Sequence, residues 1–449
     1  AAITLKLRDG ETEFLEPSTL RRIVKTYSDH IAIPVVLAED GKEETVNSAS
    51  ALWTRSKSDI TADQYKEFYH HVAHAFDDPW LTIHYKAEGA IEYTGLLFVP
   101  SSKPFDIFHP DRKQHLKLYV KRVFITDDCA ELLPPYLRFL RGVVDSQDLP
   151  LNISREMLQH NPVLTKIKAG LVKRVLSDLK KKAEDDAEGF TTFWETFGAV
   201  LKEGIYEDFE RKDDIVALSR FRSTAGDGWV TLDQYVERMK EGQDAIYFAT
   251  GDDAAALAKS PQLEGFLAKG IEVLLLTDPI DEFWIPAVGQ FRDKKLVAVT
   301  DSSIDLSAVK GDDASGQDKP EAAPAEDMDT LVAALKLALG DAVRDVKASE
   351  RLTESACCLV ADPGQMSIHL EKLLKAHRQL DQSFPRILEI NPRHGLIKGL
   401  AARVKAGGRE AVDDAAHLLL DQARILEGEP PADPAAFARR LAAVMEKGL

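Results

Sequence analysis

The segment 148–159, with the sequence DLPLNISREMLQ, concentrates polar side chains that could grip a phosphate. Ser154 is suited to cap a short helix that starts at Arg155. Gln159 follows Arg155 by four residues, so the two side chains would lie on one helical face. A guanidinium makes charge-assisted bonds to a polyphosphate, and an amide adds orientation. The residue types leave a second interpretation open, in which Arg155 only ties the loop down through a salt bridge.

Other catalytic signatures are absent from the sequence, which has no GxxxxGK[ST], GxGxxG, HExxH, CxxC or GxSxG motif. His70 and His74 are four residues apart and could share a helical face, but no cysteine accompanies them. Exposed polar side chains explain this pair more simply, so we predict no metal site. The adjacent Cys357 and Cys358 lie in an apolar run, which favours buried thiols over redox chemistry.

The composition narrows the class of protein. The 57 Lys and Arg residues against 74 Asp and Glu residues give a formal net charge of −17, which disfavours nucleic acid as a partner. No stretch approaches the ~18–20 uninterrupted apolar residues of a membrane helix, so we expect no membrane insertion. Three cysteines without metal-ligand spacing favour a reducing compartment, and we expect a cytoplasmic protein.

The first part of the chain predicts an α/β unit. Alternating residues predict a strand at 3–7, and a sequence that opens inside a strand suggests a piece of a longer protein. Thr61 is placed to cap a helix. Helices are also expected at 18–27, 162–179 and 190–210, and strands at 81–85, 93–99 and 117–125. Strands with flanking helices indicate layered α/β packing.

The second part predicts a smaller α/β unit and a final helix-rich domain. The smaller unit has a βαβ pattern of strand 245–250, helix 253–269 and strand 271–277, with a further strand at 296–300. Residues 311–329 are rich in acidic residues, Pro, Ala and Gly without an apolar period, which is typical of a linker. A helix is expected to begin at 331–339.

The segment Lys117–Gln159 closely resembles the middle domain of the heat-shock protein 90 molecular chaperones, in their bacterial HtpG form. Further stretches of the chain agree with this family in the same order. They are EFLEPSTLRRIVKTYSDHIAIPV, ALWTRSKSDIT, YKEFYHHVAHAFDDP, TLDQYVERMKEGQDAIYFATGD, IEVLLLTDPIDEF and LEINPRHGLIKGL. The resemblance covers essentially the whole chain.

The resemblance implies a multi-domain α/β (α+β) fold, with two layered α/β units joined by a helical segment and followed by a helix-rich α/β dimerisation domain. The implied divisions are a remnant of an N-terminal ATPase domain (1–37), the large α/β part of the middle domain (38–160), a helical connector (161–224), the small α/β part (225–309), an acidic linker (310–329) and the C-terminal domain (330–449).

The resemblance also implies a function, that of a chaperone and heat-shock protein that responds to stress. In the full-length family ATP and Mg bind to the N-terminal domain, and Arg155 matches the arginine that reaches the γ-phosphate. Gln159 matches its helper, and Asn152 lies in the same loop. Since the ATP pocket's motifs are missing from this sequence, we expect no cofactor and no ATP hydrolysis by this chain alone. The alternatives are a stand-alone ATP hydrolase and a passive dimeric scaffold.

Two sets of apolar residues are expected to bind the partners of the chain. These partners are partly folded client proteins and a second copy of the chain. The client-binding candidates are Phe76, Phe105, Ile107, Phe108, Phe283, Trp284, Met366, Leu370 and Leu374. The dimerisation candidates, on the last two helices, are Val412, Leu419, Leu426, Phe437, Leu441 and Val444. Ordinary packing within the core remains the alternative for the aromatic residues, and coverage of their own domain for the two helices.

Overall fold

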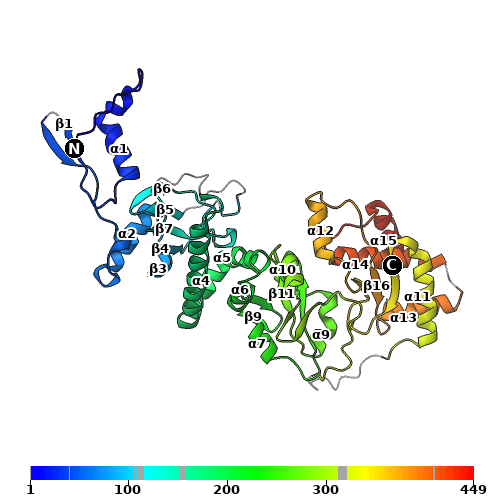
Figure 1. The fold of residues 1–449 in the computed structure, drawn as a ribbon. Helices are drawn as coiled ribbons and strands as arrows, with labels where there is room; N and C mark the ends of the chain where they lie inside the picture. The colour runs from blue at the N-terminus through cyan, green and yellow to red at the C-terminus, as the bar shows by residue number, and fades with distance from the viewer. Residues whose placement is uncertain are drawn as a thin grey trace. The chain divides into compact units, whose positions relative to one another are not determined.

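The structure is a computed structural model that describes residues 2–39, 41–105, 107–109, 116–151, 158–311, 321–407 and 410–448. The chain divides into two compact units, Ala1–Leu218 and Ser219–Leu449, and each is described by itself. Both units contain sheets with flanking helices, which is the expected α/β multi-domain fold (Figure 1).

The first unit begins with helix α1 (Pro17–Tyr27) and a hairpin of β1 (Val36–Glu39) and β2 (Lys42–Thr45). The predicted strand at 3–7 is wrong, because no described residue pairs with it and Ile3 is 87% exposed. Alternating polarity marks a segment that could join a sheet, but a strand exists only where a neighbour supplies hydrogen bonds.

A five-stranded sheet in the order β3-β4-β7-β5-β6 forms the centre of this unit. Its strands are β3 (Pro79–Ala87), β4 (Tyr93–Pro100), β5 (Leu116–Val120), β6 (Val123–Thr126) and β7 (Arg141–Ser146). Helix α2 (Ala62–Ala73) begins as predicted at Thr61, whose hydroxyl accepts from the Gln64 amide while the Gln64 side chain accepts from the Thr61 amide. Tyr69 of α2 and Phe98 of β4 are buried together in one cluster.

The predicted strand 117–125 is two strands, β5 and β6, joined by a two-residue turn. Lys121 and Arg122 form this turn with φ of 51° and 67°, so the chain reverses between the paired residues Val120 and Val123. Neither residue type signals a turn, which is why the apolar pattern concealed it.

Three helices complete the first unit: α4 (Pro162–Asp185), α5 (Ala187–Glu207) and α6 (Lys212–Leu218). The side chain of Asn161 caps α4, and Pro162 occupies its first turn. The helix expected at 162–179 is present as α4, and its apolar stripe of Leu164, Ile167, Leu171, Val175 and Leu179 is buried.

The second unit opens with a six-stranded sheet in the order β12-β13-β10-β11-β8-β9. The strands are β8 (Phe221–Ser223), β9 (Gly226–Val230), β10 (Ala245–Thr250), β11 (Leu274–Leu276), β12 (Gln290–Phe291) and β13 (Lys294–Ala298). Helices α7 (Leu232–Glu237) and α10 (Asp281–Val288) lie in the same part of the chain. As predicted, β10 and β11 pair in parallel.

The predicted helix 253–269 is broken into α8 (Ala254–Leu257), a short 3-10 turn and α9 (Glu264–Ala268). Pro261 opens the 3-10 turn, because a proline cannot continue the preceding helix. Gly270 follows α9 with a φ of 66°, the left-handed backbone that commonly ends a helix.

The remainder of the unit packs helices on a three-stranded sheet in the order β14-β16-β15. Its elements are α11 (Ala325–Leu339), β14 (Asp345–Ala348), β15 (Cys357–Val360), α12 (Ile368–Ala376), β16 (Ile387–Ile390), α13 (Gly395–Lys405), α14 (Glu410–Leu426) and α15 (Pro434–Gly448). Helix α11 starts inside the predicted linker 311–329, because Glu326 and Asp327 suit the first turn of a helix. Residues 312–320 of that linker are outside the described part.

Candidate functional site

The predicted phosphate-contacting segment is described only at its ends. Asn152 and Arg155 lie outside the described residues, whereas Gln159 is exposed. Upstream, Leu149 is buried and its amide donates to Ser146 Oγ over 3.2 Å. Downstream, Leu158 is buried just before Gln159. Both flanks are thus anchored in the first unit, and the predicted role of Arg155 stays a prediction.

Two exposed aromatic residues of the first unit lie on loops that are tied together. The side chains of Phe76 and Phe105 are fully exposed. Asp77, next to Phe76, accepts hydrogen bonds from the backbone amides of Ser101 and Ser102, each over 3.0 Å. The turn that carries Phe76 is therefore held against the start of the loop that carries Phe105. The structure thus ties together the two segments that bear these predicted client-binding residues.

The same loop corrects one prediction, because Ile107 is 4% exposed and cannot contribute to a surface. Its carbonyl accepts from Arg138 Nε over 2.7 Å, which holds this part of the loop inward. Phe108 is 53% exposed and lies 4.5 Å from Lys103 Nζ in a cation–π contact. The exposed set on these loops is therefore Phe76, Phe105 and Phe108.

In the second unit, α10 and α12 are joined by charged side chains. Glu282 of α10 accepts from Ser367 Oγ over 2.8 Å and lies 3.0 Å from His369 Nδ1. Asp252 lies 3.3 Å from His369 Nε2 and 2.6 Å from Lys372 Nζ. The hydrogen bond to Glu282 raises the pKa of His369, since a neighbouring carboxylate favours the imidazolium. These contacts fix the start of α12 to α10 and to Asp252, which follows strand β10 of the six-stranded sheet.

Helix α10 carries two neighbouring aromatic residues that were predicted to bind clients, and they differ in exposure. Phe283 is 38% exposed and remains a surface candidate. Trp284 is fully buried, so its predicted contact with clients is wrong for this structure. Its indole N–H donates to Asp281 Oδ1 over 2.6 Å, and its ring packs against Phe221 at 5.6 Å between centroids. An internal partner for the indole makes this burial stable.

Helix α12 presents different side chains on different faces. Ser367 caps it by accepting from the Leu370 amide over 2.9 Å. Ile368 and Glu371 are buried, and the predicted client-binding residues Met366, Leu370 and Leu374 are half-buried. A pocket of about 580 Å³ lies against the face formed by Ile368, Glu371, Lys372 and Lys375. With 100° between successive residues, Leu370 and Leu374 belong to another face of the helix.

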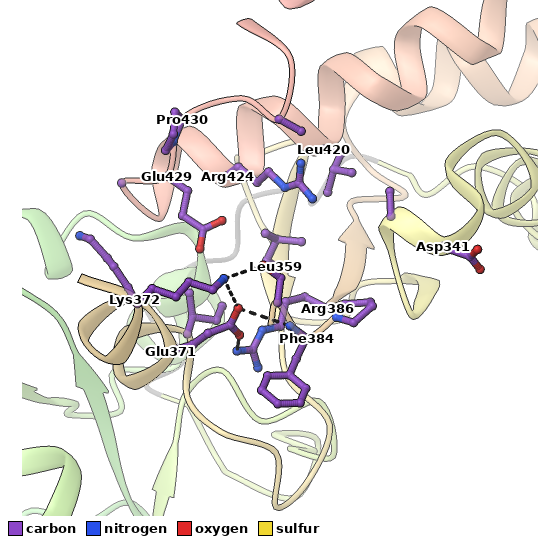
Figure 2. Close-up of a pocket in the computed structure, with 17 residues that line it drawn as sticks. Asp341, Leu359, Glu371, Lys372, Phe384, Arg386, Leu420, Arg424, Glu429 and Pro430 are labelled. Atoms are coloured by element: carbon purple, nitrogen blue, oxygen red, sulfur yellow. Dashed lines mark hydrogen bonds and ion pairs between the residues drawn. The ribbon is translucent and has the colours of Figure 1, made fainter. Parts of the chain in front are cut away.

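Figure 2 shows this pocket between α12, the end of α14 and the segment that leads into β16. Glu371 is buried and accepts from Arg386, from Lys375 Nζ over 2.5 Å and from the Phe384 amide over 3.3 Å. Glu371 and Arg386 form a buried ion pair. Removal of either residue would leave the charge of the other buried without its partner. The pocket wall next to α12 is therefore held by polar contacts, and Leu359, Leu420 and Pro430 add apolar surface.

Sequence reasoning missed Arg386, Phe384 and Arg424, which line this pocket. One feature of the sequence could have indicated this pocket. Arg386 directly precedes the apolar run ILEI of β16, and a charge beside a buried strand needs a partner. That partner, Glu371, is on a helix that looks only amphipathic in the sequence.

The six predicted dimerisation residues divide into two groups. Val412 and Leu419 of α14 are each 2% exposed and pack in the core of their own domain, so they cannot also form a surface. Leu426, Leu441 and Val444 are 52%, 41% and 51% exposed. Phe437 is half-buried. The exposed apolar stripe therefore runs from the end of α14 along α15.

The cysteines and histidines show no arrangement for metal chemistry in the part of the chain that the structure describes. His70 Nε2 lies 2.9 Å from the Asp77 carbonyl oxygen. Cys357 and Cys358 are buried in β15, and burial raises the pKa of the Cys357 thiol to about 12. Among the same described residues, no helix combines the length and apolar character needed to cross a membrane.

Comparisons with known proteins identify the family of this chain. Residues 38–449 match the family described as Hsp90 protein. The Chaperone protein HtpG of Paramagnetospirillum magneticum is 71% identical over 451 residues, which cover the whole chain and 72% of that protein. Those of Rhodospirillum rubrum and Roseobacter denitrificans are 63% and 52% identical, with the same coverage. The chain therefore belongs to the Hsp90 family of molecular chaperones.

Proposed function

We propose that this chain binds partly folded client proteins through exposed aromatic and aliphatic side chains, as part of a homodimeric cytoplasmic chaperone. The observation that carries client binding is the full exposure of Phe76 and Phe105 on two loops tied together by Asp77. Large apolar side chains grouped on a surface usually mark an interaction site. Phe108, which lies three residues after Phe105, is also exposed. The three residues Phe76, Phe105 and Phe108 are called the loop patch.

The loop patch suits clients better than a single fixed partner. Burial of a phenylalanine side chain contributes roughly 1.5–3 kcal/mol, so a few such contacts give weak, reversible binding. Partly folded proteins expose apolar residues in no fixed order, which such a patch can accept without shape matching. In the second unit, Phe283 and the half-buried Met366, Leu370 and Leu374 provide further apolar surface.

Dimerisation through the exposed stripe of α14 and α15 would add to this weak binding. Two copies present every client contact twice, and linked sites raise the overall affinity without any new contact. Leu426, Leu441 and Val444 supply the apolar surface that such an interface needs. A four-helix bundle with a two-fold axis is the simplest way for two such helix pairs to cover one another.

The ATPase role belongs to the full-length protein. There, Arg155 would contact the γ-phosphate of ATP held with Mg by the N-terminal domain, with Gln159 and Asn152 assisting. A guanidinium at a transferring phosphate stabilises the charge that develops in the transition state. In the full-length protein, Arg155→Ala should lower the rate of ATP turnover at least about tenfold with no change in melting temperature. An unchanged rate would reject this role.

Client binding is tested by light scattering from an unfolding enzyme that aggregates on warming. The chain should slow this aggregation, and the double variant Phe76→Ser, Phe105→Ser should lose most of the effect, because it removes the fully exposed part of the loop patch. Substitutions at exposed positions usually change stability by less than about 0.5 kcal/mol, so the fold should be retained.

A matched control is Phe209→Ser, which removes another aromatic side chain of the first unit that is 81% exposed but is not part of the loop patch. This variant should suppress aggregation as well as the unchanged chain does. If the unchanged chain has no effect on aggregation, or if the control loses as much as the double variant, the assignment of client binding to the loop patch is rejected.

A further inference from the structure

A cavity of about 660 Å³ in the first unit has a local charge opposite to that of the chain. Its lining includes five cationic side chains and one carboxylate, in a protein whose formal net charge is −17. These side chains are Arg55, Lys57, Lys86, Lys121, Arg122 and Glu92. Lys86 Nζ already lies 2.6 Å from Glu88 Oε1, so among the described residues four of the five cations have no ion-pair partner. Repulsion among grouped cations is unfavourable unless an anion offsets it, so the grouping needs an explanation.

A series of hydrogen bonds connects the segments that line this cavity. Tyr65 Oη lies 2.7 Å from His84 Nδ1, and His84 Nε2 lies 2.9 Å from the carbonyl oxygen of Trp53. Burial lowers the pKa of His84, so the ring is neutral; it donates through Nε2 to the carbonyl and accepts from Tyr65 at Nδ1. The Trp53 indole then donates to Asp145 Oδ2 over 2.8 Å, and Asp145 Oδ1 accepts from the Arg122 amide over 3.1 Å.

This series fixes the cationic residues at both ends. Trp53 immediately precedes the segment with Arg55 and Lys57, and Asp145 holds the turn Lys121–Arg122. Because each polar group in the series has a partner, the arrangement is rigid and leaves none of these buried groups unsatisfied. The fold therefore holds the backbone segments that carry Arg55, Lys57, Lys121 and Arg122 at the cavity.

The turn Lys121–Arg122 also departs from ordinary turn chemistry. Both residues have a left-handed backbone, where Asn-Gly is the preferred pair and other residues are strained. The chain has a second such turn, Arg292–Asp293, with φ of 45° and 62°. That turn contains an acidic residue, Asp293, and its Arg292 forms an ion pair with Asp233 over 2.8 Å. Within the described residues, neither Lys121 nor Arg122 has an ion-pair partner.

We propose that this cavity binds a small anion with two or more adjacent phosphate groups. A single charge on exposed cations gains little, but a phosphate chain can reach several cations at once and form charge-assisted bonds with each. The volume lies within the ~300–1,000 Å³ of ordinary small-molecule sites. A strained basic turn that is held by a buried carboxylate fits a binding role, because local rules of sequence are most often broken at functional sites.

The test is calorimetric titration of the chain with inorganic triphosphate at low salt. One site per chain is expected, with an affinity that falls as salt is added. The double variant Lys121→Asn, Arg122→Gly installs the preferred turn pair and removes two of the five cations. Its affinity should fall at least about tenfold, while its melting temperature stays the same or rises.

The matched control is Arg292→Asn, Asp293→Gly, which relaxes the other turn in the same way. Its affinity for triphosphate should equal that of the unchanged chain. The proposal is overturned if the unchanged chain does not bind, if the Lys121/Arg122 variant binds equally well, or if both double variants lose affinity alike.

A second set of titrations identifies the source of the phosphates. Equal affinity for ATP and triphosphate would show that the phosphate chain is recognised whether it is free or part of a nucleotide, and tighter binding of triphosphate would assign the site to inorganic chains. If adenosine monophosphate binds as tightly as triphosphate, a single phosphate is sufficient and the proposal is wrong. None of these results depends on client binding.

Discussion

Helices α14 and α15 carry apolar side chains at the same helical spacing, yet the structure uses them differently. In α14, Val412, Leu419 and Ala423 are buried in the core of the domain. In α15, Leu441 and Val444 remain exposed. A periodic stripe shows that a helix has an apolar face, but it does not show what covers that face. One stripe maintains the fold of the domain, and we propose that the other is covered by a second copy of the chain.

The largest difference between the two helices should appear in stability. Leu419→Ala removes a buried side chain and should destabilise the domain by about 2–5 kcal/mol, whereas Leu441→Ala should change its stability by less than about 0.5 kcal/mol. Hydrogen exchange of the β16 amides, read by mass spectrometry, reports this domain without interference from the first unit. Similar protection in the two variants would contradict the contrast between the helices.

At the end of α14, the stability of the domain is expected to depend on pH. Burial raises the pKa of Glu427 to about 7, and Gln262 Nε2 donates to its Oε1 over 2.7 Å. A carboxyl whose folded pKa is raised destabilises the fold above that pKa, and this penalty fades as pH falls toward the ordinary value near 4.5.

Glu427→Gln keeps the acceptor for Gln262 and removes the charge. It should stabilise the domain by up to roughly 3 kcal/mol at pH 8 and have little effect near pH 4.5. Calorimetric melting temperatures at several pH values test this expectation. A difference that does not change with pH would show that the charge of Glu427 is not its cause.

A smaller effect is expected at the start of α15. Asp433 Oδ1 accepts from the Ala436 amide over 2.9 Å, and this hydrogen bond lowers the pKa of Asp433. Asp433→Ala should speed exchange of the first-turn amides of α15 roughly fivefold without affecting β16. Asp433→Asn, which also caps helices well, should restore slow exchange. If the alanine variant also loosens β16, then α15 supports the core more than its exposure indicates.

The sequence was sufficient where local signals agree. The helix expected from residue 162 and the cap at Thr61 were predicted and are present, because periodicity and capping depend on neighbours along the chain. The turn at Lys121–Arg122 was missed, since neither residue is typical of a left-handed turn.

The candidate site was harder to predict because it depends on contacts between distant segments. The burial of Ile107 and Trp284 follows from partners elsewhere in the fold, the Arg138 side chain for Ile107 and the Phe221 ring for Trp284. Arg386 lines a pocket only because Glu371 lies beside it, and no local pattern joins those two residues. Sequence patterns therefore identified apolar candidates but could not separate exposed residues from buried ones.

The most direct test of the central claim is the mass of the chain in solution, measured by light scattering after size separation. The unchanged chain should have the mass of two copies, and Leu441→Asp, Val444→Asp should have the mass of one with an unchanged circular dichroism spectrum. Leu337→Asp, at an α11 position that is 82% exposed, should remain a dimer. A double variant that remains a dimer, or an unchanged chain with the mass of one copy, would contradict the assignment of the α15 stripe to a second copy.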